Sequence, residues 1–138
     1  MRQNKIMAVI ATLALGMSAL SASAQDFPVK KTITLMVGFA AGGATDTAAR
    51  VIAKKLGENL GQTVVVENKG GAGGNIAHQY TASGPTDGSL LLFGSIGPLT
   101  IAPHLMKLPY DPVKDLAPIT MGVNFPNVLV VGVDTRLL

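Results

Sequence analysis

The feature that most constrains the fold is the run Thr32 to Phe39 (TITLMVGF), which is β-branched and apolar with almost no polar alternation. A half-buried strand would alternate between apolar and polar residues, whereas a strand covered on both faces shows a continuous apolar run. A small-residue segment, Ala40 to Ala44, follows at once. The sequence therefore predicts a buried parallel strand that ends in a tight glycine-rich loop.

A helix is expected after this loop, with Thr45 and Asp46 as its N-terminal caps and Gly61 as its C-cap. Its apolar positions recur at helical spacing, at Ala48, Ile52, Leu56 and Leu60. The segment Thr63 to Glu67 (TVVVE) predicts a second strand.

The same unit then repeats. A glycine cluster between residues 70 and 74 precedes Asn75, which is expected to cap a short helix from Ile76 to Ala82. GPTDG at 84–88 predicts a turn and Ser89 to Phe93 a third strand. Strands that alternate with helices predict an α/β fold, mostly a parallel sheet with helices on both faces.

The pattern weakens after Pro98. A short helix is expected over Thr100 to Met106 and a loop over Leu108 to Pro118, with further strands at Ile119 to Val123 and Val128 to Val133. No closing element follows the last of these strands, so we expect a truncated domain.

The first 24 residues have the pattern of a secretory signal peptide: basic residues from Arg2 to Lys5, an apolar run to Met17 and small residues up to Ala24. Cleavage near Ala24 would leave residues 25–138 as the folded part, in the periplasm. The formal charge of +3 would then fall to about +1, because two of the eleven basic residues lie in the signal. This near-neutral charge gives no indication of nucleic-acid binding, and the absence of cysteine excludes disulfides and cysteine-bound metals.

A ligand site is expected where the winding of the sheet reverses. With strand order 2-1-3 this point lies between the first and third strands, so the loops involved are Ala40 to Asp46 and Gly94 to Thr100. Neither contains Lys or Arg. Helix N-terminal N–H groups, together with the hydroxyls of Thr45, Ser95 and Thr100, could hold a small anion. The alternative is that these glycines serve only as tight turns.

Other motifs fit less well. GGAGGN at 70–75 lacks the lysine of a P-loop. The segment Phe93 to Gly97 resembles a nucleophile elbow with Phe in place of the first glycine, and His78 or His104 could supply a base. A secreted serine hydrolase is therefore a less favoured alternative, and we expect neither an enzyme nor a cofactor or metal site.

Several motifs in order resemble the Bug family, the extracytoplasmic solute-binding proteins of tripartite tricarboxylate transporters. They are Phe27-Pro28, VGFAAGGATD at 37–46, LGQTVVVEN at 60–68, GAGGNI at 71–76, PTDG at 85–88 with the strand that follows, LPYDPVKD at 108–115 and PNVLVV at 126–131. The resemblance implies two α/β domains of a type II periplasmic-binding-protein-like fold that close on a small carboxylate or acidic amino acid. Because such proteins are roughly twice this length, the chain is expected to carry only the first, N-terminal domain and to bind carboxylates weakly or not at all on its own.

Carried over by motif, the resemblance assigns ligand binding to Phe39, Ala41, Gly42, Gly43, Thr45, Asp46, Asn75, Ser95 and Gly97. The partners that it implies are membrane transporter subunits or, as an alternative, a sensor protein for which the chain would act as a ligand-sensing receptor.

Overall fold

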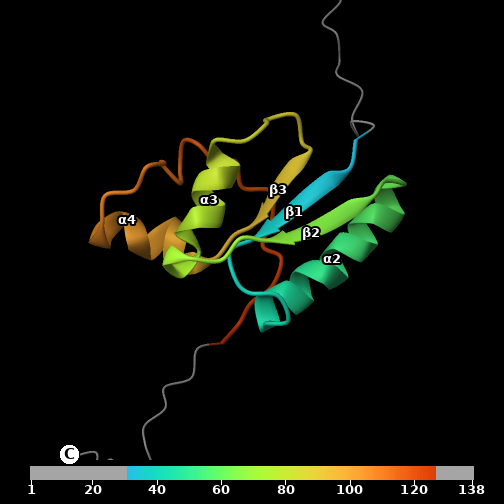
Figure 1. Cartoon of the computed structure of the whole chain (residues 1–138), viewed down its shortest axis with the longest axis horizontal. Helices are drawn as coiled ribbons and strands as arrows, with labels where there is room; N and C mark the ends of the chain where they lie inside the picture. Colours follow the sequence, from blue (N-terminus) through green and yellow to red (C-terminus); the bar gives the residue numbers. More distant parts are fainter. Residues whose placement is uncertain (1–30, 127–138) are drawn as a thin grey trace, which may run out of the picture.

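The computed structural model describes residues 31–126, which form a three-layer α/β unit. Its elements are β1 (Ile33–Val37), α2 (Ala44–Leu60), β2 (Val64–Asn68), the 3-10 turn η2 (Ala72–Gly74), α3 (Asn75–Ala82), β3 (Leu90–Phe93), the π-helical turn η3 (Gly97–Ile101) and α4 (Ala102–Leu105). Figure 1 shows them in chain order. The expected signal peptide and the strand expected at 128–133 lie outside the described residues.

The three strands form a parallel sheet in the order β2-β1-β3, as predicted. Val37 pairs with Asn68 on one side and with Phe93 on the other, so the carboxyl ends of all three strands are level. The predicted fold class is confirmed, and the reversal of winding lies between β1 and β3.

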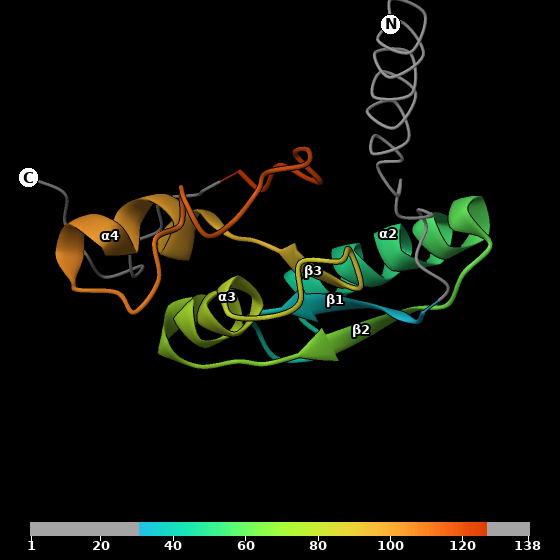
Figure 2. The same cartoon turned by 90° about the horizontal axis from the view of Figure 1, so that it is seen from above.

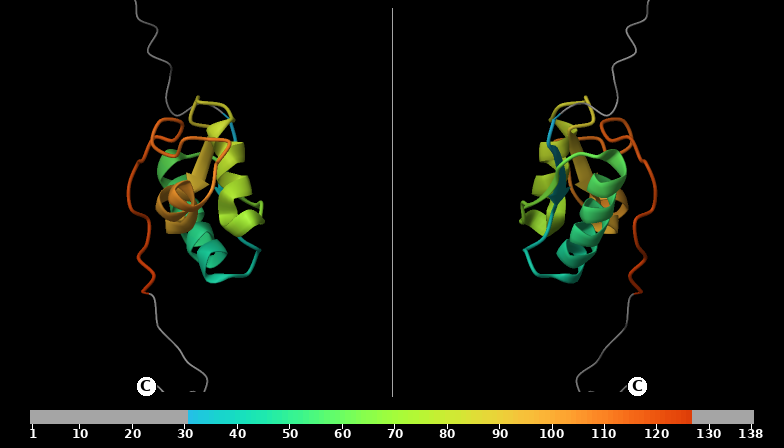
Figure 3. Two further views of the ribbon diagram at one scale, coloured as in Figure 1. Left: turned by 90° about the vertical axis from the view of Figure 1, so that its left-hand side faces the viewer. Right: turned by 90° about the vertical axis from the view of Figure 1, so that its right-hand side faces the viewer.

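The helices cover opposite faces of the sheet, and Figure 3 shows the strands between α2 and α3. Leu35 and Val37 of β1 pack against Ala49 and Ala53 of α2 in one buried cluster. Met36, which points to the opposite face because strand side chains alternate, is also fully buried. Burial on both faces explains the unbroken apolar run of β1.

The ends of α2 are set by two glycines. Gly43 is the N-cap and has no side chain to bond, so the expectation that Thr45 and Asp46 cap the helix is wrong: both lie inside its first turn. The C-cap is Gly61, as predicted, with φ of 63° and its N–H donated to Gly57 O. The predicted apolar positions are half-buried, whereas the fully buried ones, Ala49 and Ala53, lie one residue further along.

Asn75 likewise is not a cap. It is the first residue of α3, and Gly74 is the N-cap, with φ of 98°. The left-handed backbone that this turn needs favours glycine, which has no Cβ to clash.

The segment after β3 winds earlier than expected, since η3 begins at Gly97 rather than at Thr100 and runs directly into α4. Figure 2 shows η3 and α4 extending away from the sheet, followed by the loop that returns toward it. The expected strand at 119–123 is absent from the described residues. A Cβ on Gly122 would lie 3.0 Å from the Phe93 ring and 3.4 Å from Ile52 Cδ1, so this segment crosses over side chains and does not lie beside β3.

Candidate functional site

Three loops leave the sheet at the same edge, because β1, β2 and β3 end level with one another. They are residues 38–43 after β1, residues 69–74 after β2 and residues 94–96 after β3. These loops contain five of the nine predicted site residues, namely Phe39, Ala41, Gly42, Gly43 and Ser95. The other four open the elements that follow: Thr45 and Asp46 lie in the first turn of α2, Asn75 is the first residue of α3 and Gly97 is the first residue of η3. The two loops predicted to bind a ligand therefore lie on neighbouring strands.

The loops meet at Gly74. A Cβ placed there would lie 3.2 Å from Pro98 Cγ, 3.6 Å from Phe39 Cζ and 3.6 Å from Ser95 Oγ. On the other side, a Cβ on Gly38 would lie 3.0 Å from Gly74 Cα. The structure thus brings together Phe39 and Ser95, two of the predicted ligand residues, through the backbone of a glycine.

The first loop is held by the carboxylate of Asp46, which is buried. Its Oδ2 accepts the Gly42 N–H at 2.8 Å and Arg50 Nε at 2.9 Å, and its Oδ1 accepts Asn68 Nδ2 at 2.9 Å. Hydrogen bonds from Arg50, Gly42 and Asn68 lower the pKa of Asp46 to about 2. Because both oxygens are engaged by the chain itself, Asp46 positions the loop and does not point at a ligand.

The remaining residues of this loop are open. Ala41, Gly42 and Gly43 are exposed, and Gly42 has a φ of 83°. Thr45 lies in the first turn of α2, where backbone N–H groups have no partner within the helix. The N–H groups of Ala41, Gly43 and Thr45 and the Thr45 hydroxyl could face an anion, whereas the Gly42 N–H is already donated to Asp46.

In the loop after β3, the hydroxyl of Ser95 is buried and has no hydrogen-bond partner among the described residues. A buried hydroxyl without a partner is costly, which makes this oxygen a candidate to bond a ligand or water. Gly97 faces the glycine turn, since its added Cβ would lie 4.0 Å from Gly73 O. Thr100, by contrast, donates its hydroxyl to Ile96 O at 2.8 Å.

His78 does not form a catalytic pair with Ser95. Its ring lies in α3 with no exposed surface, Nδ1 is 2.9 Å from Gly74 O, and Nε2 accepts the backbone N–H of Ser95 at 3.3 Å. Burial lowers the pKa of His78. His104 is exposed in α4. A catalytic serine donates a hydrogen bond from its hydroxyl to a base. Here His78 Nε2 instead accepts the backbone N–H of Ser95, so it does not activate the hydroxyl.

Asn75 also has a role within the chain. Its Nδ2 donates to Ala72 O at 2.8 Å, and its Oδ1 accepts the hydroxyl of Tyr110 at 2.9 Å. Tyr110 is buried and ties the loop after α4 to the start of α3. The Asn75 side chain therefore shapes the glycine turn, and its Oδ1 is engaged by Tyr110.

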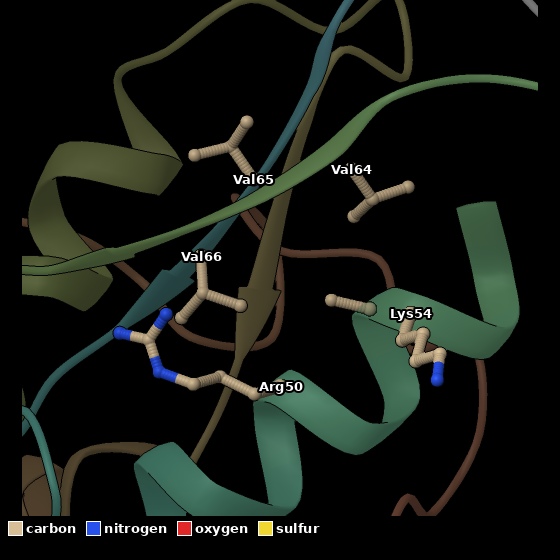
Figure 4. Close-up of a pocket in the computed structure, with 6 residues that line it drawn as sticks. Arg50, Lys54, Val64, Val65 and Val66 are labelled. Carbon is tan, nitrogen blue, oxygen red and sulfur yellow. The ribbon is translucent and has the colours of Figure 1, made fainter.

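A shallow groove lies elsewhere, along the outer edge of β2. Arg50, Ala53 and Lys54 of α2 line it together with Val64 to Val66. In Figure 4, Val64 and Val66 face α2 while Val65 points the other way. This groove is separate from the three loops at the carboxyl edge.

Within residues 31–126, no group of three or more metal-ligating side chains comes together. Over the same range, no helix is long and apolar enough to cross a membrane.

The loops after β1 and β3 contain no cation and lie at a reversal of winding of a parallel sheet, which is where open α/β proteins bind their ligands. Lys69, in the loop after β2, has its Nζ over the Tyr80 ring, 4.6 Å from the centroid. A family model described as the tripartite tricarboxylate transporter family receptor matches residues 48–137, and the chain belongs to this family. The resemblance stated from the motifs is thereby confirmed.

Curated relatives match nearly the whole chain. Protein BugT of Bordetella pertussis is 40% identical over 140 residues, which cover 99% of this chain and 43% of BugT. A protein encoded between tcbD and tcbE in Pseudomonas sp. is 39% identical, over 93% of this chain and 39% of its own length. The chain thus spans about two fifths of the length of these relatives.

Solved structures agree with the fold. A structure described as a periplasmic transporter is 41% identical with a TM-score of 0.60, over 64% of this chain and 30% of its own. MatC from Rhodopseudomonas palustris with bound malate is 40% identical, with a TM-score of 0.53 over 64% and 30%. An R. palustris protein solved with adipate is 38% identical, with a TM-score of 0.56 over 64% and 29%.

Proposed function

We propose that the chain is a periplasmic solute-binding protein that captures a small carboxylate for a tripartite tricarboxylate-type transporter. The observation that carries this proposal is the meeting of the loops after β1 and β3 at Gly74, where Ser95 presents a buried hydroxyl without a partner. Relatives of the same family were solved with adipate and with malate, which supports a dicarboxylate as the ligand.

The two loops proposed to bind the anion contain no formal positive charge. The sequence from Phe39 to Asp46 contains no Lys or Arg, and neither does that from Gly94 to Thr100. The nearest cation in the first loop's hydrogen-bond network is Arg50, whose guanidinium is engaged by Asp46 and Asn68. Backbone N–H groups, the hydroxyls of Thr45 and Ser95, and bridging water would then bind the carboxylate.

We further propose that residues 25–138 form the first α/β domain of a two-domain protein, with residues 1–24 as its export signal. The coverage of BugT, 43% of its length, supports this division. One domain supplies only one wall of a cleft between two domains, so the 138-residue chain should bind weakly. In this proposal the chain binds and does not catalyse, because the Ser95 hydroxyl lacks a base.

Calorimetry with malate, adipate and citrate tests the proposal, using the 138-residue chain and a fusion in which Leu138 is followed by the rest of BugT. We expect the chain alone to bind no tighter than about 1 mM and the fusion to bind one of the acids in the micromolar range, a gain of about 4 kcal/mol. Micromolar binding by the chain alone would contradict the half-site, and failure of both proteins with all three acids would contradict carboxylate binding.

The contribution of Ser95 is tested in the same fusion. Ser95→Ala should weaken binding about tenfold to 150-fold, because it removes one hydrogen bond to a charged group, worth about 1.5–3 kcal/mol. Thr100→Ala is the matched control, since its hydroxyl is already bonded to Ile96 O. Equal effects of the two substitutions would remove Ser95 from the site.

A further inference from the structure

The contacts of His78 select one form of its ring. Gly74 O can only accept a hydrogen bond, so the proton must be on Nδ1, 2.9 Å away. The Ser95 backbone N–H can only donate, so Nε2 must be unprotonated. Both bonds are satisfied together only by the neutral imidazole with its proton on Nδ1.

This ring joins the two parts of the candidate site. Gly74 belongs to the turn on which Phe39 and Pro98 pack, and Ser95 belongs to the loop after β3. A second connection runs in parallel through Tyr110, whose hydroxyl donates to Asn75 Oδ1 at 2.9 Å and to Pro98 O at 3.3 Å. The two rings are stacked, with centroids 6.4 Å apart.

The surroundings of the ring contain no compensating charge. Three elements packed around it, β1, β3 and the segment from Gly94 to Ile101, contain no charged residue. In the segment that carries Tyr110, the adjacent Asp111 is paired with Lys114. Tyr110 is the titratable group that faces it, and α3 itself adds Tyr80, which is half-exposed. A proton added to His78 would therefore be buried without a counter-ion, which is unfavourable.

We propose that His78 is a pH-responsive positioning residue: neutral, it fastens the Ser95 loop to the glycine turn, and protonated, it releases that loop. The protonated ring would place an Nε2–H against the Ser95 N–H, two donors that repel. As far as ligand affinity is concerned, this inference rests on the proposed function. Affinity for a carboxylate falls when the pH drops through the titration of His78.

Two substitutions separate the two bonds. His78→Gln extends an amide oxygen toward the position of Nε2, so it can accept the Ser95 N–H and does not titrate. His78→Asn keeps a donor near Gly74 O and is too short to reach Ser95. His104→Gln, at an exposed histidine, controls for loss of a titrating ring.

The first test uses NMR on the ligand-free chain. Long-range imidazole ¹⁵N–¹H spectra at pH 8 should place the His78 proton on Nδ1. On acidification the ring and the Ser95 amide should shift with one midpoint, and the Ser95 shift should vanish in His78→Gln but persist in His104→Gln. A proton on Nε2, a Ser95 amide that ignores the titration, or protonation only as the whole chain unfolds would each overturn the switch.

The second test measures malate affinity in the BugT fusion, one pH unit above and below that midpoint. Because malate also titrates, the dissociation constant of wild type is divided by that of His78→Gln at the same pH. We expect this ratio to be near one above the midpoint and about five below it, because wild type then binds malate more weakly. His78→Asn should bind malate weakly at both pH values. A ratio of dissociation constants that stays the same or falls on acidification would contradict the release of the loop. Loss of malate binding in all proteins, with the NMR result intact, would overturn the proposed function and leave the His78 bridge standing.

Discussion

Asn68 Nδ2 lies 2.9 Å from Asp46 Oδ1, so the last residue of β2 is bonded to the first turn of α2. The same nitrogen lies 3.0 Å from Phe39 O, in the loop that leaves β1. Asn68 can reach both because it pairs with Val37 at the level where β1 ends. The shape of the first candidate loop therefore depends on a residue of the neighbouring strand.

Asn68→Ala should lower the free energy of unfolding by about 1–3 kcal/mol, because Phe39 O and the Asp46 carboxylate lose a donor. Urea denaturation measures this change. Glu67→Ala, at the adjacent exposed position of β2, should stay within about 0.5 kcal/mol of wild type. A cost for Asn68→Ala no larger than that of Glu67→Ala would show that the amide does not hold the loop.

Acid should weaken the chain through Asp46. Its pKa is about 2 in the folded state against 3.8 when unperturbed, so the unfolded chain binds the proton first. The contribution of Asp46 is complete above about pH 4 and is lost as the pH falls toward 2. Unfolding free energies measured across this range should fall more steeply in wild type than in Asp46→Asn. Parallel slopes in the two proteins would contradict this account.

The sheet could be predicted from sequence because its signals are local. The unbroken apolar run of β1 reflects burial under both α2 and α3, and Gly61 at the end of α2 has the left-handed backbone that a helix C-cap needs. The carboxyl-edge placement of the two loops then follows from strand order alone. The prediction of a strand at 119–123 is wrong, because its apolar residues do not indicate whether the edge of a neighbouring strand is free to pair.

The roles of individual site residues were harder to predict. Asp46 and Asn75 were expected to face a ligand, yet their polar atoms bond Asn68 and Tyr110, residues 22 and 35 positions away. Sequence spacing cannot report such contacts between separate elements. One signal was present for Asn68, a polar residue that closes an apolar strand next to β1, whereas nothing local indicates that Tyr110 is buried.

Gly74 should tolerate alanine poorly. Its φ of 98° disfavours any side chain, and a Cβ there would meet Pro98 at 3.2 Å. Gly61 is the matched control, because it also has a positive φ and has open space around its added Cβ. We expect Gly61→Ala to cost about 1 kcal/mol and Gly74→Ala about 2–3 kcal/mol in urea denaturation. Equal costs would mean that the three loops are not packed tightly enough at Gly74 for an added Cβ to clash with Pro98.

Tyr110→Phe tests the tie between the loop after α4 and the start of α3. The substitution keeps the buried ring and removes the donor to Asn75 Oδ1 and Pro98 O, so the free energy of unfolding should fall by about 1 kcal/mol. Tyr80→Phe, on the half-exposed tyrosine of α3, should change it by less than about 0.5 kcal/mol.

The stabilisation that Tyr110 provides should decrease at alkaline pH. Burial raises the pKa of Tyr110, so the unfolded chain loses the phenolic proton first. The stabilisation is complete below about pH 10 and is lost as the pH rises further, a decline that Tyr110→Phe should reduce. Unfolding free energies of the two proteins between pH 8 and 11 measure it, and a decline of equal slope in both would assign the alkaline loss to groups other than Tyr110.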